Sequence, residues 1–213
     1  MENSAKKIAE YLLQIKAIKL QPSNPFTWAS GWKSPIYCDN RKTLSFPEVR
    51  SYIRDSFVSL VNGLYPQAEM IAGVATGAIS HGALVADRME LPFVYVRSGA
   101  KEHGLGNQIE GFYKEGQRVV VIEDLISTGG SSLNAVKALR EAGCVVLGMA
   151  AIFTYEFRKA SDGFAAERCT LNTLCNYSVL IETAVKSGYI TEADVETLRK
   201  WRADPANWGQ GKD

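Results

Sequence analysis

Two adjacent acids beside a run of small hydroxyl residues are the part of this chain best suited to chemistry. Glu123 and Asp124 follow the apolar run 119–122, and a Ser/Thr/Gly turn over residues 127–131 precedes a helical pattern that begins at Leu133. Amides at the start of a helix bind phosphate. Carboxylates accept hydrogen bonds from hydroxyls or hold a hydrated cation. A phosphorylated sugar satisfies both halves, so the segment predicts a site for one.

Two other phosphate-binding motifs do not fit the same residues. A P-loop ends in Gly-Lys-Ser/Thr, whereas residues 129–131 read Gly-Gly-Ser. A dinucleotide-binding loop has the spacing GxGxxG, and the near match at residues 104–106 lacks the third glycine. The remaining alternative is an ordinary strand-to-helix turn with two solvated acids, for which this set of acids and hydroxyls would be unusual.

The composition indicates a globular protein without a strong charge. The chain has 213 residues, 46% of them hydrophobic, which is enough for one sizeable core. Its net charge of +1 gives no basic field that would favour nucleic acid. No apolar run approaches the ~20 residues that span a bilayer, and the N-terminal residues have no apolar signal core. We therefore expect a cytoplasmic protein that binds neither nucleic acid nor membrane.

The thiols and imidazoles do not suggest a metal centre. The four cysteines are scattered without a CxxC pair, and the chain has only two histidines. This pattern favours reduced thiols over disulfides or a zinc site. We expect His81, which lies in a helical pattern, to be a structural histidine with satisfied hydrogen bonds.

Strand and helix patterns alternate through the middle of the chain. Strands are expected at residues 70–74, 92–96, 119–122 and 144–153, with helices at 79–89 and 133–141. Further helices are expected over residues 8–18, from a capping box at Ser45 and Glu48 through Leu60, at 179–186, and at 193–202 after a Thr191 cap. The alternation predicts an α/β fold with a central, mostly parallel sheet flanked by helices. Ligands bind beyond the carboxyl ends of such strands.

A long polar segment at residues 97–117 separates the second and third predicted strands. Loops of this length in compact domains are usually functional. The segment begins with Arg97 and contains Lys101 and His103 among glycines. Cationic groups on a closing loop can neutralise a leaving group and exclude water. The alternative is a solvated surface loop whose charges have no role.

Three segments together resemble the orotate phosphoribosyltransferases, within the type I phosphoribosyltransferase family. Residues 118–132 resemble the phosphoribosyl pyrophosphate (PRPP) motif of that family. The Lys-Glu-His-Gly run at 101–104 resembles its catalytic loop, and Ser30-Gly31-Trp32-Lys33-Ser34-Pro35-Ile36-Tyr37 resembles its N-terminal hood. The resemblance implies one phosphoribosyltransferase domain over residues 1–213, with a hood near 1–42 and a catalytic loop near 97–117.

The resemblance also implies a reaction and residue roles. The reaction would convert orotate and PRPP to orotidine 5-monophosphate and pyrophosphate in pyrimidine biosynthesis, with Mg²⁺ held mainly by PRPP rather than by the protein. Lys101, His103 and Asp124 would be catalytic. Ser127 would contact orotate, with Tyr37 as a further candidate. The PRPP site would comprise Arg97, Lys101, His103, Glu123, Asp124, Leu125, Ile126, Ser127, Thr128, Gly129, Gly130 and Ser131. The family's homodimers share this loop between subunits, so a homodimer is implied.

The chain departs from the family at three places. Many members have a second lysine after the loop arginine, where this chain has Ser98 and Gly99. Some have a lysine before the hood's Ser-Gly, where this chain has Ala29. Some pair an arginine after the fourth strand with the orotate carboxylate, where this chain has Thr154 and Tyr155. The candidates that remain for binding the carboxylate are hood amides, Lys33 and Arg41.

Two other functions remain as alternatives. The protein could transfer phosphoribose to another nucleobase, although the hood sequence favours orotate. It could instead be a regulator that senses PRPP, although such a protein needs a basic surface for nucleic acid, and the N-terminal helix is only mildly basic.

Overall fold

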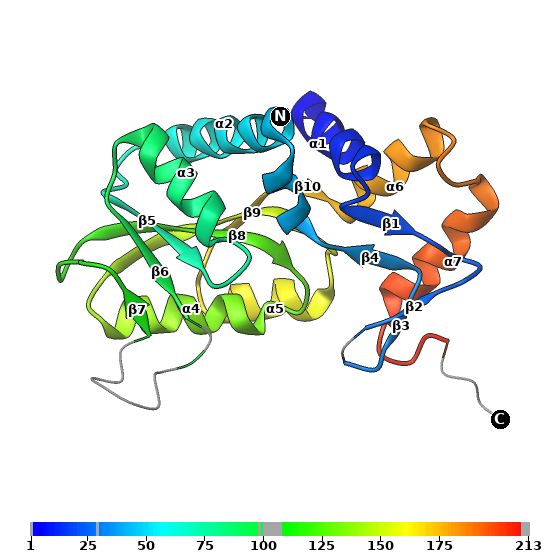
Figure 1. The fold of residues 1–213 in the computed structure, drawn as a ribbon. Coiled ribbons are helices and arrows are strands. Elements are labelled where there is room, and N and C mark those ends of the chain that lie inside the picture. The colour runs from blue at the N-terminus through cyan, green and yellow to red at the C-terminus, as the bar shows by residue number, and fades with distance from the viewer. Residues whose placement is uncertain (1, 29, 98, 100–107, 210–213) are drawn as a thin grey trace.

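A six-stranded sheet forms the centre of the computed structural model, which describes residues 2–28, 30–97, 99 and 108–209 (Figure 1). The strand order is β10-β9-β8-β5-β6-β7. The strands are β5 (Met70–Val74), β6 (Phe93–Val96), β7 (Ile109–Glu110), β8 (Arg118–Ile126), β9 (Val145–Thr154) and β10 (Leu171–Asn176). All neighbours pair in parallel except β6 and β7, which are antiparallel. The predicted α/β fold with a mostly parallel sheet is confirmed.

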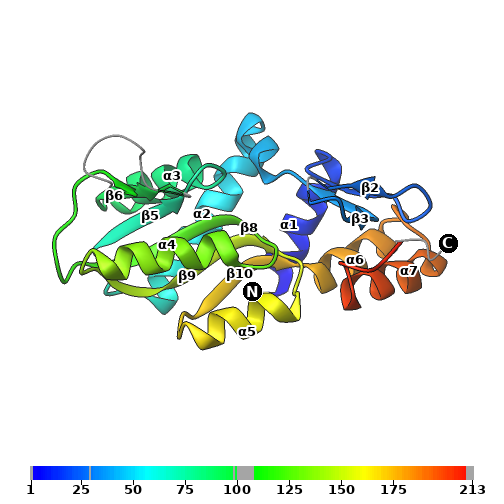
Figure 2. The same ribbon diagram turned by 90° about the horizontal axis from the view of Figure 1, so that it is seen from below.

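Helices cover both faces of this sheet (Figures 1 and 2). One layer contains α1 (Glu2–Gln14), α2 (Pro47–Leu64), α3 (Ile79–Met89) and α6 (Tyr177–Lys186). The opposite layer contains α4 (Gly130–Glu141) and α5 (Arg158–Ala166). The strands are apolar on both faces because each face packs on a helical layer.

The central strand β8 shows how the apolar run produces this arrangement. Successive strand residues point to opposite faces of a sheet. Val120 and Ile122 accordingly pack in the core beneath α1, α2 and α3, whereas Val119 and Val121 pack in the core beneath α4 and α5. The same alternation reaches the acids that follow, so Glu123 and Asp124 leave the strand on opposite faces.

Two small antiparallel sheets and a C-terminal helix stand beside the main sheet, at the right of Figure 1. The strands are β1 (Ile18–Leu20) with β4 (Ile36–Cys38), and β2 (Phe26–Thr27) with β3 (Lys33–Ser34). A 3₁₀ helix, η1 (Asn40–Ser45), leads from β4 into α2. The ring of Trp28 lies 5.6 Å from that of Trp201 in α7 (Glu192–Ala203), so aromatic packing joins this region to the C-terminus.

Several predicted boundaries are wrong. Strand β8 runs four residues beyond the predicted end at Ile122, and α4 begins at Gly130 rather than Leu133. The capping box at Ser45 does not form, because Ser45 ends η1 and α2 begins at Pro47 without a side-chain cap. Ile18 belongs to β1 rather than to the first helix. The Thr191 cap of α7 is confirmed and forms a full capping box with Asp194.

Several elements have no counterpart among the predicted ones, including β1 and η1 near the N-terminus. Neither α5 nor the edge strand β10 was predicted. Residues 97–117 were predicted to be one polar loop, but Ile109–Glu110 within them pair with β6 as β7. All four cysteines are free thiols in the structure. Among the described residues, no helix combines the length and apolar character needed to cross a membrane.

Candidate active site

The two acids of β8 have different environments. Glu123 is only 4% exposed, and its Oε2 accepts a hydrogen bond of 2.8 Å from the hydroxyl of Ser132 in α4. Its Oε1 accepts a bond of 2.9 Å from the main-chain amide of Asp124. Glu123 therefore fastens the first turn of α4 to the end of β8. Asp124 projects from the other face of the strand, toward Gly77, and lines a cavity together with Arg41 of η1.

Burial changes the ionisation of both carboxyl groups. Burial raises the pKa of Glu123, and the charge of the adjacent Asp124 raises it further. Burial also raises the pKa of Asp124, although Arg41 is among the groups that oppose this shift. Two adjacent buried acids cannot both ionise without cost. Glu123 is the more buried of the two, so it is the acid that keeps its proton more readily.

The two hydrogen bonds of Glu123 predict only a small loss of stability for Glu123→Gln. The amide oxygen can still accept the Asp124 amide bond, and the amide nitrogen can donate to the Ser132 hydroxyl. We expect the free energy of unfolding to fall by less than about 1 kcal/mol in this variant, and by about 1–3 kcal/mol in Glu123→Ala, which leaves both partners unpaired. Urea unfolding measures both. Equal losses in the two variants would contradict the structural role of Glu123.

Asp124 faces a cavity of about 330 Å³, here called the acid cavity. Its lining residues are Cys38, Asp39, Arg41, Val74, Ala75, Thr76, Gly77, Glu123, Asp124, Leu125 and Ser131. A Cβ atom on Gly77 would collide with the Asp124 carboxylate, so only glycine allows this approach. The Asn40 side-chain amide donates a 2.6 Å bond to the main-chain carbonyl of Asp124 and holds the strand end in place.

The turn that follows β8 has the geometry of a phosphate-binding loop. Gly129 is the N-cap of α4 and has a φ of 82°, a conformation that favours glycine. The first amide of α4 with a main-chain partner is that of Leu133, which donates to the Gly129 carbonyl. Within the described chain, the amides from Thr128 to Ser132 donate no main-chain hydrogen bond. Such a set of free amides at a helix start favours an anion.

A second cavity, here called the aromatic cavity, adjoins the acid cavity. It measures about 580 Å³. The lining residues are Thr27, Trp28, Ser30, Trp32, Tyr37, Cys38, Leu125, Ser127, Thr128, Tyr155 and Lys159. Cys38 and Leu125 line both cavities, so the two share a wall. Indole and phenol rings make this chamber suitable for a flat ring, beside one suitable for a phosphorylated sugar.

The structure brings many of the predicted site residues together. Ser127, Thr128 and Tyr37 line the aromatic cavity, Ser131 lines the acid cavity, and Leu125 lines both. Trp28 and Trp32 also line the aromatic cavity.

Other predicted site residues lie elsewhere. The Ile126 side chain is fully buried in the core, and the Ile126 carbonyl accepts a hydrogen bond from the Tyr155 amide. Neither group is therefore well placed to bind a ligand. Gly129 and Gly130 form the helix start without lining either cavity. Arg97 follows β6 but lines neither cavity, and its guanidinium lies 3.6 Å from the Glu110 carboxylate. Lys101 and His103 fall outside the described residues.

Two residues next to the site, Asn40 and Lys159, were not predicted from the sequence. Asn40 is 84 residues from Asp124, and no spacing in the sequence connects the two. Lys159 lies in α5, which was not predicted. The His81 Nε2 lies 3.1 Å from the Thr43 hydroxyl, but Nδ1 has no hydrogen-bond partner among the described residues, so the prediction that both ring nitrogens are satisfied is only partly correct. Burial lowers the pKa of His81 to about 4, so this side chain is neutral at neutral pH.

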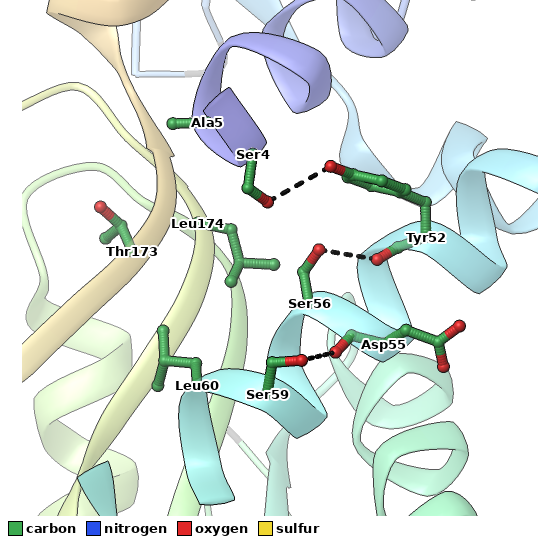
Figure 3. Close-up of a pocket in the computed structure, with 9 residues that line it drawn as sticks. All are labelled: Ser4, Ala5, Tyr52, Asp55, Ser56, Ser59, Leu60, Thr173 and Leu174. Carbon is green, nitrogen blue, oxygen red and sulfur yellow. Dashed lines mark hydrogen bonds between the residues drawn. The ribbon is translucent and has the colours of Figure 1, made fainter. Parts of the chain in front are cut away.

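A larger cavity of about 620 Å³ lies between α1, α2 and β10, away from the acids (Figure 3). Most of its polar side chains already have partners. The Tyr52 hydroxyl lies 3.4 Å from that of Ser4, and Ser56 and Ser59 donate to carbonyls of their own helix. Asp55 pairs with Arg54. Because these side chains already have partners, few polar groups of this cavity are available to bind a ligand. The acid and aromatic cavities are therefore the better candidate active site.

Sequence comparisons connect this chain to a known family. The phosphoribosyl transferase domain family matches residues 49–184, which include β5 to β10 and α4. An orotate phosphoribosyltransferase of Bacteroides fragilis is 58% identical over 212 residues, covering 100% of both chains. One from Bacillus caldolyticus is 60% identical over 202 residues, covering 95% of this chain and 98% of the relative.

A comparison of structures agrees with the sequence matches. The crystal structure of orotate phosphoribosyltransferase from Aeropyrum pernix superposes with a TM-score of 0.75 at 27% identity. The match covers 86% of this chain and 99% of the other. The amide-lined turn, the acids and the fold are thus found together with full-length similarity to enzymes of one activity. The chain belongs to the orotate phosphoribosyltransferases, within the phosphoribosyltransferase family.

Proposed function

We propose that the protein transfers the 5-phosphoribosyl group from PRPP to orotate, giving orotidine 5-monophosphate and pyrophosphate. The bond between ribose C1 and the pyrophosphate oxygen breaks, and a bond forms between C1 and a ring nitrogen of orotate. The observation that carries the proposal is the shared wall of the two cavities. The shared wall supports the proposal, because a phosphorylated sugar in one cavity would lie directly beside a flat ring in the other.

The acid cavity and the turn after β8 are the proposed PRPP site. The free amides from Thr128 to Ser132 would bind the ribose 5-phosphate. The Asp124 carboxylate, in the cavity lining, would accept hydrogen bonds from the ribose hydroxyls. Glu123 would act mainly by positioning, because its two oxygens already accept bonds from Ser132 and the Asp124 amide.

The aromatic cavity is the proposed orotate site. Ser127 would contact the pyrimidine, and Tyr37, which is 38% exposed, would border it. Deprotonated orotate is itself a good nucleophile, so the protein needs little base catalysis. Its main task is to hold C1 near the attacking nitrogen while the sugar develops oxocarbenium character.

Mg²⁺ is the proposed cofactor, held mainly by the oxygens of PRPP. The described residues contain no group of three His, Cys, Asp or Glu side chains that could hold a metal alone. Asp124 nevertheless faces the cavity and can bind water molecules of a hydrated ion. The ion would neutralise charge on the departing pyrophosphate.

Loop cations and a second subunit complete the proposal. Lys101 and His103, by the family resemblance, would neutralise the pyrophosphate as it leaves. Arg97 would assist after exchanging its partner Glu110 for a phosphate oxygen. We propose a homodimer in which each loop serves the neighbouring subunit's site.

Loss of orotate absorbance tests the reaction. We expect the absorbance of free orotate to fall only when protein, PRPP and Mg²⁺ are all present, with pyrophosphate released in equal amount. A parallel panel with uracil, adenine and guanine tests the acceptor. Turnover of another base with no consumption of orotate would replace orotate as the substrate. Binding of PRPP without turnover of any base would favour a sensor.

A further inference from the structure

The aromatic cavity has one cationic side chain among its described lining residues, Lys159. The other lining residues have hydroxyl, thiol, aromatic or aliphatic side chains. Orotate is a flat ring with a carboxylate, so a cavity that binds it needs a partner for that charge. A carboxylate taken from water without a partner loses far more than its ring gains by packing.

The two cations that the sequence left as candidates are less suitable. The Lys33 ammonium donates a 2.8 Å bond to the Thr27 hydroxyl, and Lys33 does not line the aromatic cavity. Arg41 lines the acid cavity instead, where its Nε donates a 2.7 Å bond to Asp39. Both groups thus already have partners, and neither residue lines the aromatic cavity.

Lys159, by contrast, has no ion pair or hydrogen bond from its side chain in the described part of the chain. Its neighbour Arg158 pairs with Asp162 at 3.5 Å on the exposed side of α5. Lys159 is the second residue of α5, where the helix dipole disfavours a cation. Helix stability therefore does not explain a lysine here, whereas an anion in the adjacent cavity would.

We propose that Lys159 binds the carboxylate of orotate and selects orotate over uncharged pyrimidines. The inference rests on the proposed function, because it assumes that orotate occupies the aromatic cavity. Lys159 would be a specificity-determining residue that takes the place of the arginine found after the fourth strand in some relatives, where this chain has Tyr155. Tyr155 is almost fully buried against Trp28 and Phe157 and forms part of the cavity wall. The positive charge that would bind the carboxylate therefore comes from Lys159 in α5 instead of from position 155.

Steady-state kinetics of Lys159→Ala, Lys159→Arg and the parent protein test this role. A charge-assisted hydrogen bond at an exposed site supports an expected rise of about tenfold in the orotate KM of Lys159→Ala. The PRPP KM should not change. Lys159→Arg keeps the charge and should recover most of the affinity. The kcat/KM for uracil, which has no carboxylate, should be equal in all three proteins, so the preference for orotate falls by the same tenfold.

Arg158→Ala is the matched control, because it removes an adjacent cation of α5 that pairs with Asp162. It should leave the KM for orotate unchanged. An unchanged orotate KM in Lys159→Ala, or an equal rise in the uracil and PRPP KM, would overturn the assignment. Failure of the proposed function has a different signature, because the parent protein would then not consume orotate at all.

Discussion

Replacing Asp124 with asparagine is expected to weaken PRPP binding by about tenfold to a hundredfold, the loss of one or two hydrogen bonds to a charged acceptor. The fold should survive, because the Asn40 amide holds the main-chain carbonyl of Asp124, which the substitution keeps. Burial already raises the pKa of this carboxyl group, so a neutral amide should fit the free protein. Calorimetric titration with PRPP and Mg²⁺ measures the affinity, and thermal unfolding checks the fold.

Two further variants distinguish the effect of losing a negative charge near the cavity from the effect of displacing the Asp124 carboxylate. Glu123→Gln neutralises the neighbouring acid, which binds Ser132 rather than facing the cavity freely, and should change PRPP affinity much less. Gly77→Ala keeps the Asp124 carboxylate but displaces it by collision, and should weaken PRPP binding as Asp124→Asn does. If PRPP bound Asp124→Asn and the parent equally well, Asp124 would have no part in holding the ribose.

The core of the sheet could be predicted because its apolar runs are buried on both faces. The end of β8 could not, because Glu123 and Asp124 end the apolar run while the strand continues. Its last residues are held by pairing with β9, where Leu125 lies opposite Phe153 and Ile126 opposite Thr154. That pairing is a tertiary interaction, and no local pattern reports it. The opposite orientation of the two acids follows once the strand is extended through them.

The site was predictable to different degrees in its two halves. The acids, the turn and the hood are local motifs, and they meet where the sequence expects them. Asn40 and Lys159 reach the site through the tertiary fold, from η1 and α5. The capping box at Ser45 failed because Pro47 takes the first helical position, so that Phe46 rather than Ser45 is the N-cap and the helix begins one residue later than predicted.

Lys101→Ala is expected to lower kcat by about 10²–10³, the usual effect of removing one donor that stabilises developing charge. The PRPP KM should change little, since a group that acts on the leaving pyrophosphate contributes mainly in the transition state. Pre-steady-state measurement of orotate consumption distinguishes a slower chemical step from slow product release. A Lys101→Ala variant with parental kcat would remove Lys101 from the mechanism.

Mixing Lys101→Ala with Asp124→Asn tests whether the loop acts across a dimer. A mixed dimer then contains one subunit with an intact Asp124 and one with an intact Lys101. If the loop reaches the partner's site, one of the two sites regains both residues. Random subunit exchange should then restore about one quarter of the parental activity. If each loop serves its own subunit, every site keeps one defect and the mixture stays as inactive as its components. Recovery of activity on mixing therefore requires a lysine supplied by the second chain.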